Sequence, residues 1–276
     1  MDINSFTVLN NGVKMPWVGF GTFKIKDKNT AVSSVKEALR LGYRHIDTAA
    51  IYGNEEAVGE AIKDSKVKRE DIFLTSKLWN SEHDYDRALK AFDESIKKLG
   101  TDYLDLYLIH WPGKSNKDAW RALEKLYKDG RIKAIGVSNF KVHHLEELIN
   151  ECDIVPTVNQ VEYHPEYPQT ELHEFCKKHK IQLEAWGPLM QGKIFEISLM
   201  KELSDKYGKT ISQIALKWDL QMGVVTIPKS STKARIKENM SLYDFEISEE
   251  DMKKIAELNI GERIGPDPDL IADEIK

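Results

Sequence analysis

The sequence predicts an α/β fold, a closed (β/α)8 barrel (TIM barrel) in which each of eight parallel strands is followed by a helix. Short β-branched or apolar runs alternate with helical patterns along the whole chain, and the centres of consecutive runs lie 23 to 42 residues apart. Polar residues follow these runs, as expected where parallel strands end at one rim of a barrel. The predicted strands are 18–22, 44–48, 72–77, 104–110, 132–138, 157–161, 181–186 and 224–228.

The segments between the runs carry the helical period. In 29–41, apolar residues recur on one face, and Gly42 stands where a helix would end. The widest spacing, before the last predicted strand, leaves room for two helices in place of one. The clearest predicted helices are 29–41, 86–99, 197–207 and 210–222.

Both ends of the chain add elements to the eight repeated units. An Asn-Gly turn between alternating runs in 6–15 predicts a β-hairpin, which we expect to cover the barrel bottom. After the last unit, 248–259 is predicted to be an extra helix that begins at a Ser248 cap. The tail at 265–269 is expected to be irregular.

Because no linker or low-complexity tract divides the chain, we expect a single domain over 1–276.

Composition excludes several classes of protein. With 40 Lys and Arg against 45 Asp and Glu, the net charge is −5, so no general positive field attracts nucleic acid or anionic lipid. No apolar run approaches the length of a membrane span, and the start has no signal-peptide pattern. The two cysteines, Cys152 and Cys176, have no metal spacing, and we expect no metal at His143 or His144 either. We expect a cytoplasmic monomer that acts on a small molecule.

Four residues at the predicted rim form a chemical set, namely Asp47, Tyr52, Lys77 and His110. A buried Lys77 ammonium favours the phenolate form of Tyr52 and would lower the pKa of its phenol, and Asp47 would keep that ammonium charged. His110 can hydrogen-bond a carbonyl oxygen and fix its direction. The set contains no nucleophile and no source of electrons, so it predicts reduction of a carbonyl group by an external hydride.

An anion site is predicted after the last strand. Lys229, Ser230, Thr232 and Arg235 cluster where a helix N-terminus supplies free N–H groups, the usual place of a phosphate site in such barrels. An ordinary capped surface helix with solvated charges is the alternative.

The motifs around these residues resemble the aldo-keto reductases. They include Asp47-Thr-Ala-Ala-Ile-Tyr52-Gly-Asn-Glu, Thr75-Ser-Lys77-Leu-Trp, Asp105-Leu-Tyr-Leu-Ile-His110-Trp-Pro, Asn159-Gln160-Val-Glu-Tyr-His-Pro and Ile227-Pro-Lys229-Ser. The likeness runs from about Thr7 to Arg263. It implies NADPH-dependent carbonyl reduction on a (β/α)8 barrel, with a catalytic tetrad of Asp47, Tyr52, Lys77 and His110.

The resemblance also implies a set of residues that bind NADPH or NADP+. Lys229, Ser230 and Arg235 would hold the 2′-phosphate, and Trp186 would stack on the nicotinamide ring. Gly187 stands where relatives often have serine, which puts a side-chain contact there in doubt. The remaining expected contacts are Glu238 and Asn239 at the adenine, Ser138, Asn139 and Gln160 at the carboxamide, and Gly21, Thr22, Asp47, Leu189 and Thr232.

Aromatic residues are expected to line the substrate pocket. Phe23, Trp79 and Trp111 follow three of the predicted strands, close to Tyr52 and His110. The loop after His110, the segment after Leu189 and the C-terminal tail are short, which indicates an open pocket for small aldehydes and dicarbonyls. The pattern is most similar to the bacterial glyoxal and methylglyoxal reductase branch, and a branch that reduces ketogluconates is an alternative.

Two other functions are open at this stage. Strand alternation directs Glu162 and Glu184 inward on neighbouring strands, and two carboxylates on a barrel could hydrolyse glycosides. The barrel could also act as a cofactor-sensing module, like the cytoplasmic β-subunits of potassium channels that share the fold. The intact tetrad favours turnover over sensing.

Overall fold

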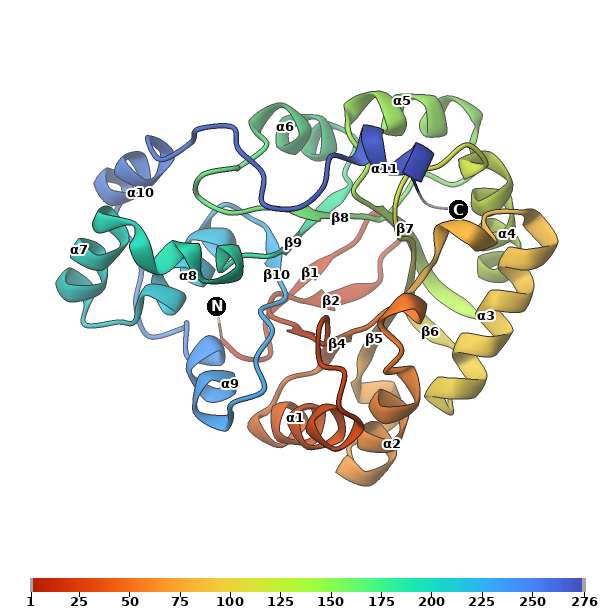
Figure 1. Cartoon of the computed structure of the whole chain (residues 1–276), viewed down its shortest axis with the longest axis horizontal. Coiled ribbons are helices and arrows are strands. Elements are labelled where there is room, and N and C mark those ends of the chain that lie inside the picture. The colour runs from red at the N-terminus through yellow and green to blue at the C-terminus, as the bar shows by residue number, and fades with distance from the viewer. Residues whose placement is uncertain (1, 275–276) are drawn as a thin grey trace.

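The computed structural model describes residues 2–274, with eight parallel strands curled around a common axis and helices packed outside them (Figure 1). The strands are hydrogen-bonded in chain order from β3 to β10, and every pair is parallel. This confirms the predicted (β/α)8 fold. The strands are β3 Phe20–Gly21, β4 His45–Asp47, β5 Phe73–Leu78, β6 Leu104–Ile109, β7 Ile132–Ser138, β8 Val158–Glu162, β9 Gln182–Trp186 and β10 Val225–Thr226.

The first and last strands meet through the residues just before β3. Val18 forms a parallel bridge with Thr226, the Gly19 N–H donates to Thr226 O at 2.9 Å, and Thr226 N–H donates to Trp17 O at 3.1 Å. A Cβ on Gly19 would lie 2.6 Å from the His45 ring, so only glycine allows this close approach. These contacts close the barrel.

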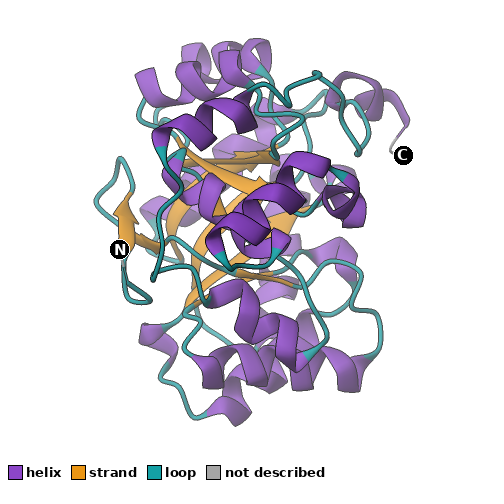
Figure 2. Ribbon diagram, turned by 90° about the vertical axis from the view of Figure 1, so that its left-hand side faces the viewer, coloured by secondary structure: helices purple, strands orange, loops and turns teal. Residues whose placement is uncertain are grey.

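The hairpin formed by β1 (Phe6–Val8) and β2 (Lys14–Pro16) covers the barrel bottom, as predicted. Its Leu9 and Met15 are buried together with Phe73, Val158 and Val225, which lie where three strands begin. Figure 2 shows the hairpin on the left of the barrel strands, beside the N-terminus. The opposite rim is therefore left for the site.

The helices follow the predicted pattern closely. Asp27 caps the first of them by accepting from the Thr30 N–H at 2.8 Å, and Gly42, with φ of +105°, ends it. The helices are α1 Lys28–Leu41, α2 Glu55–Ser65, α3 Tyr85–Leu99, α4 Asn116–Lys128, α5 Val142–Glu151, α6 Thr170–Lys178, α7 Ser198–Tyr207, α8 Ile211–Gln221, α9 Lys233–Met240 and α10 Glu249–Ala256, and the short 3₁₀ helices are η1 Ala50–Tyr52, η2 Arg69–Asp71, η3 Asn80–Glu82 and η4 Met190–Glu196.

The prediction of an irregular tail at 265–269 is wrong in part, because the helix α11 (Pro268–Glu274) begins within it. Lys141 at the start of α5 forms ion pairs with Asp267 and Asp269 at 2.5 and 2.6 Å, which hold this helix against the barrel. Such a contact joins residues 128 positions apart, so no local pattern could reveal it. No helix among the described residues is long and apolar enough to cross a membrane.

Candidate active site

The four tetrad residues gather at the carboxyl ends of neighbouring strands. Asp47 ends β4, Lys77 lies near the end of β5, and His110 directly follows β6. Tyr52 ends η1, the turn that follows β4, and its side chain is only partly buried. The strand register that makes the barrel therefore brings the predicted set together.

The Lys77 ammonium is the centre of this set. Its Nζ lies 2.7 Å from Asp47 Oδ1, 2.9 Å from Thr48 O and 3.3 Å from Tyr52 Oη, so its three N–H groups each have an acceptor. The Lys77 side chain is 0% exposed, and a buried ammonium needs such compensation.

Burial and neighbouring charges together set the pKa values of these groups. Burial works to lower the pKa of Lys77, but Asp47, Tyr52 and Glu184 together outweigh it, so the pKa lies above the ordinary lysine value. Burial raises the pKa of Tyr52 above its usual value. Lys77 lowers this pKa, as predicted, but does not reverse the rise. Burial, helped by Lys77 and His83, holds the pKa of His110 well below its usual range. At neutral pH the site therefore holds a phenol, an ammonium and a neutral imidazole.

Aromatic rings form a wall around the phenol. The ring of Tyr52 lies 5.0 Å from that of Phe23 and 5.6 Å from that of His110, measured between centroids, and Trp79 lies 5.2 Å from His110. Phe23 is 53% exposed, whereas Trp111 is buried. The structure thus brings the predicted pocket residues Phe23 and Trp79 to the tetrad.

A second layer of polar side chains lies beneath the tetrad. Gln160 Nε2 donates to Asp47 Oδ2 and to Glu184 Oε2, both at 2.8 Å. Glu184 Oε1 lies 3.4 Å from Nε2 of His45, a residue that our sequence interpretation missed. Strand alternation, which directs His45 to the same side as Asp47, was the available signal.

The residues expected at the nicotinamide are bonded to one another. Asn139 donates to His110 O and to Ser138 Oγ at 2.9 and 3.0 Å, and its Oδ1 accepts from Trp186 Nε1 at 2.7 Å. Ser138 Oγ in turn donates to Gln160 O at 2.8 Å. These bonds fix the Trp186 ring and leave Gln160 Oε1 as an acceptor for an amide. The set fits a carboxamide beside an aromatic face.

Of the residues expected at the phosphate, Lys229, Ser230 and Thr232 lie between β10 and α9, and Arg235 lies in the first turn of α9. Lys229 and Arg235 are exposed, and Ser230 Oγ accepts from the Thr232 N–H at 3.1 Å. The Thr232 side chain makes no capping hydrogen bond to α9, so the first N–H groups of this helix are available to an anion. Of the predicted adenine contacts, Asn239 is buried and Glu238 accepts from Thr210 Oγ1 at 2.9 Å.

The other predicted cofactor contacts lie along the same rim. Thr22 Oγ1 donates to Asp47 O at 2.9 Å, and a Cβ on Gly21 would lie 2.8 Å from Ile227 O. Gly187 has a φ of +67°, which any other residue adopts at a cost. Leu189, half-buried, precedes η4.

The two glutamates of the glycoside-hydrolase alternative do not form an open pair. Glu162 accepts the N–H groups of Ile264 and Gly265 at 2.5 and 3.0 Å and lies 3.0 Å from His164 Nε2. Glu184 binds Gln160 instead, and both glutamates are buried. The prediction that this pair could work on a sugar is therefore wrong, and Glu162 holds the C-terminal segment on the rim.

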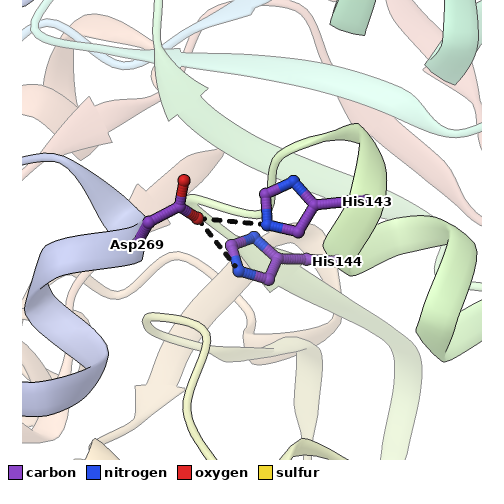
Figure 3. Close-up of side chains that lie close together, drawn as sticks. All are labelled: His143, His144 and Asp269. Atoms are coloured by element: carbon purple, nitrogen blue, oxygen red, sulfur yellow. Dashed lines mark ion pairs between the residues drawn. The ribbon is translucent and has the colours of Figure 1, made fainter.

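A cluster outside the site joins α5 to α11 (Figure 3). Nε2 of His143 and Nε2 of His144 lie 3.1 and 3.3 Å from Asp269 Oδ1. Three such groups could ligate a metal. However, His144 Nδ1 accepts from the Lys141 N–H at 3.2 Å, so its Nε2 carries the proton, and the Lys141 ammonium occupies the same carboxylate. This arrangement favours a hydrogen-bonded clasp.

Similar solved structures share the whole architecture. An aldo-keto reductase from a deep-sea metagenome library, MGS-M4, aligns with a TM-score of 0.93 and 50% identity over 95% of this chain and 98% of that one. The Bombyx mori aldo-keto reductase in complex with NADP aligns with a TM-score of 0.91 and 33% identity over 97% and 96%.

Sequence relatives agree. The chain is 58% identical over 262 residues to the glyoxal reductase of Bacillus subtilis, covering 95% of each, and 46% identical over 266 residues to the methylglyoxal reductase DkgA of Escherichia coli, covering 95% and 96%. The model of the "Aldo/keto reductase family" matches residues 17–260. The chain therefore belongs to the aldo/keto reductase family.

Proposed function

We propose that this enzyme reduces small aldehydes and dicarbonyls, such as glyoxal and methylglyoxal, to alcohols with NADPH, and that Tyr52 is the proton donor. The observation that carries the proposal is the contact of one buried Lys77 ammonium with both Asp47 and the Tyr52 hydroxyl. The likeness to glyoxal reductase and methylglyoxal reductase relatives supports the substrate class.

NADPH, when bound, supplies the hydride, and the chain supplies the proton and the orientation. As negative charge develops on the carbonyl oxygen, the Tyr52 O–H donates its proton to that oxygen. The Lys77 ammonium, 3.3 Å from Tyr52 Oη, stabilises the phenolate left behind. Asp47 keeps Lys77 charged, so the cation that stabilises the phenolate is in place before the proton is transferred.

His110 orients the carbonyl oxygen. Its imidazole is neutral and buried beside the Tyr52 ring, so one ring N–H can donate to the substrate oxygen. A neutral donor positions the oxygen without competing for the proton of Tyr52. The Phe23 and Trp79 rings lie beside Tyr52 and His110 and would offer apolar contacts to the substrate.

The cofactor would lie along the rim between two groups of residues. Lys229, Arg235 and the N-terminus of α9 would hold the 2′-phosphate, which favours NADPH over NADH. Gln160 Oε1 would accept from the carboxamide, and Trp186 would offer its ring to the nicotinamide.

The test is the variant Tyr52→Phe, which removes the hydroxyl and keeps the ring. We expect kcat for NADPH-dependent reduction of methylglyoxal to fall by about 10²–10⁴-fold, because general acid catalysis contributes that much. NADPH binding, followed by quenching of tryptophan fluorescence, should remain within about twofold.

Near-normal turnover in Tyr52→Phe would reject the proton-donor role. If the unchanged enzyme binds NADPH tightly and reduces no carbonyl compound in a panel of aldehydes, dicarbonyls and keto-sugars, the sensing function would replace the proposal. A strong preference for keto-sugars in that panel would favour the ketogluconate branch.

A further inference from the structure

Glu184 is a buried carboxyl group that the proposed mechanism does not use. It is 0% exposed, in the middle of β9, and lies inside the barrel beneath the tetrad. One donor reaches it, the Gln160 amide at 2.8 Å from Oε2. Among the described residues, Oε1 has no hydrogen-bond partner.

The surroundings of Asp47 differ from those of Glu184. Asp47 accepts from the Lys77 ammonium at 2.7 Å and from Gln160 at 2.8 Å, so a full negative charge on it is compensated. Glu184 has only the neutral amide of Gln160, which it shares with Asp47. An ionised carboxylate with one neutral donor in a dry interior is costly, whereas a carboxylic acid is not.

The neutral form also explains the contact with His45. Nε2 of His45 lies 3.4 Å from Glu184 Oε1 and 3.3 Å from Thr75 Oγ1. Burial lowers the pKa of His45 to about 3, so this ring is neutral and one of its nitrogens is an acceptor. A proton on Glu184 Oε1 would point toward Nε2 of His45, and no second charge is needed.

We propose that Glu184 is a positioning residue of the tetrad and acts as a neutral carboxylic acid. By accepting from Gln160 it fixes the amide that also binds Asp47, and by staying protonated it leaves Asp47 as the one negative charge facing Lys77. The proposal rests on the proposed function, because it describes how the barrel interior supports the Tyr52 proton transfer.

The protonation state of Glu184 sets the net charge around the tetrad. The titratable groups that face Glu184 are His45 and Asp47 on β4, Lys77 on β5 and Tyr52 on η1. With Glu184 neutral, the buried Lys77 and Asp47 charges cancel. Ionisation of Glu184 would add a net negative charge, which raises the pKa of Tyr52 further and weakens it as a proton donor.

The pKa of Glu184 decides in which direction turnover should change with pH. Burial, together with Asp47, raises the pKa of Glu184 to about 8. Below that pH the group is neutral and the tetrad keeps its charge balance. As pH rises through that value the anion forms and turnover should fall.

The experiment compares the pH profile of kcat for methylglyoxal reduction in the unchanged enzyme and in Glu184→Gln, an isosteric side chain that cannot ionise. We expect kcat of the unchanged enzyme to fall about 3–10-fold between pH 7 and pH 9. Glu184→Gln should stay within about twofold at pH 7 and hold its plateau to higher pH. An unchanged alkaline limb in Glu184→Gln, or a loss above about tenfold at pH 7, would overturn the proposal.

Asp219→Asn is the matched control. Asp219 is also a buried carboxyl with a pKa raised by burial, but it binds Thr226 behind the barrel wall and touches no tetrad residue. We expect its pH profile to match that of the unchanged enzyme. A lost alkaline limb in this control would show that buried carboxyls in general, and not Glu184, set the profile.

Infrared spectroscopy gives a reading that does not depend on activity. The difference spectrum between the unchanged protein and Glu184→Gln at pH 7 should contain the carbonyl band of one protonated carboxylic acid, which disappears above pH 9. Absence of that band at pH 7 would overturn the proposal. An enzyme that reduces no carbonyl compound would instead reject the proposed function, and the infrared result would still decide the protonation of Glu184.

Discussion

Two clusters in this molecule use the same side-chain types in different surroundings. Inside the barrel, Lys77 and Asp47 form an ion pair at 2.7 Å with the His45–Glu184 contact below it. On the surface, the clasp of Lys141, His143, His144 and Asp269 joins α5 to α11. The side chains of Lys77 and Asp47 are 0% and 3% exposed, and those of Lys141 and Asp269 are 27% and 43% exposed.

The difference shows that burial, and not residue type, decides how strongly charged groups depend on one another. Water and salt screen the surface clasp, so each of its ion pairs contributes little to stability. In the barrel each charge depends on its neighbour, because removing one partner leaves the other uncompensated. Mutations in the buried cluster should therefore change both the free energy of unfolding and the turnover of the enzyme. Mutations in the surface clasp should change only the free energy of unfolding, and only weakly.

Lys77→Met has the largest expected effect. Under the proposed mechanism it removes the cation that stabilises the Tyr52 phenolate, so kcat should fall by about 10³-fold. It also leaves Asp47 buried without its partner, which should lower the free energy of unfolding by about 3–5 kcal/mol. Steady-state kinetics and chemical denaturation measure the two losses.

A double variant, Lys77→Met with Asp47→Asn, separates these losses. It removes the uncompensated charge, so it should recover most of the stability and none of the activity. Recovery of turnover would show that Lys77 acts through folding alone. Lys128→Met, which breaks the exposed ion pair with Asp153, is the surface control and should change neither quantity.

Lys229→Ala with Arg235→Ala is the next largest change. Both cations are exposed, so their contribution to phosphate binding is screened by salt. We expect KM for NADPH to rise about 10–100-fold and KM for NADH to change by less than about threefold. The difference between KM for NADPH and KM for NADH should become smaller as salt is added to the unchanged enzyme. An equal rise for both cofactors would place the 2′-phosphate elsewhere.

The sequence predicted the barrel well because its signals are local. Each strand is a short apolar run, several helices have an apolar stripe and a terminal glycine or capping residue, and the tetrad residues lie at or just after the ends of their strands. The C-terminal helix was missed because Lys141 and Glu162, far away in the chain, hold that segment. The role of Gln160 as a bridge between two carboxyl groups was missed as well, since side-chain hydrogen bonds between strands depend on the register.

The electrostatic balance at Tyr52 could not be predicted either. Residue types alone show that Lys77 lowers the pKa of Tyr52 and that burial raises it, but they do not show which effect is larger. That depends on how completely the barrel removes water from the phenol. The same depth of burial distinguishes Glu184 from the rim-exposed pair that a glycosidase would need.

Asp269→Asn has the smallest expected effect and tests the surface side of the comparison. The substitution keeps the shape of the clasp and removes the charge that faces Lys141, His143 and His144. Because these groups are partly exposed, we expect a loss of at most about 1 kcal/mol, or a fall in Tm of about 1–4 °C. High salt should reduce the difference, since it already screens the pair. Thermal unfolding at low and high salt measures it, with Asp153→Asn as a control outside the clasp. A larger loss of stability that does not depend on salt would mean that the clasp stabilises the fold as a buried ion pair does. That result would contradict the difference proposed between the two clusters.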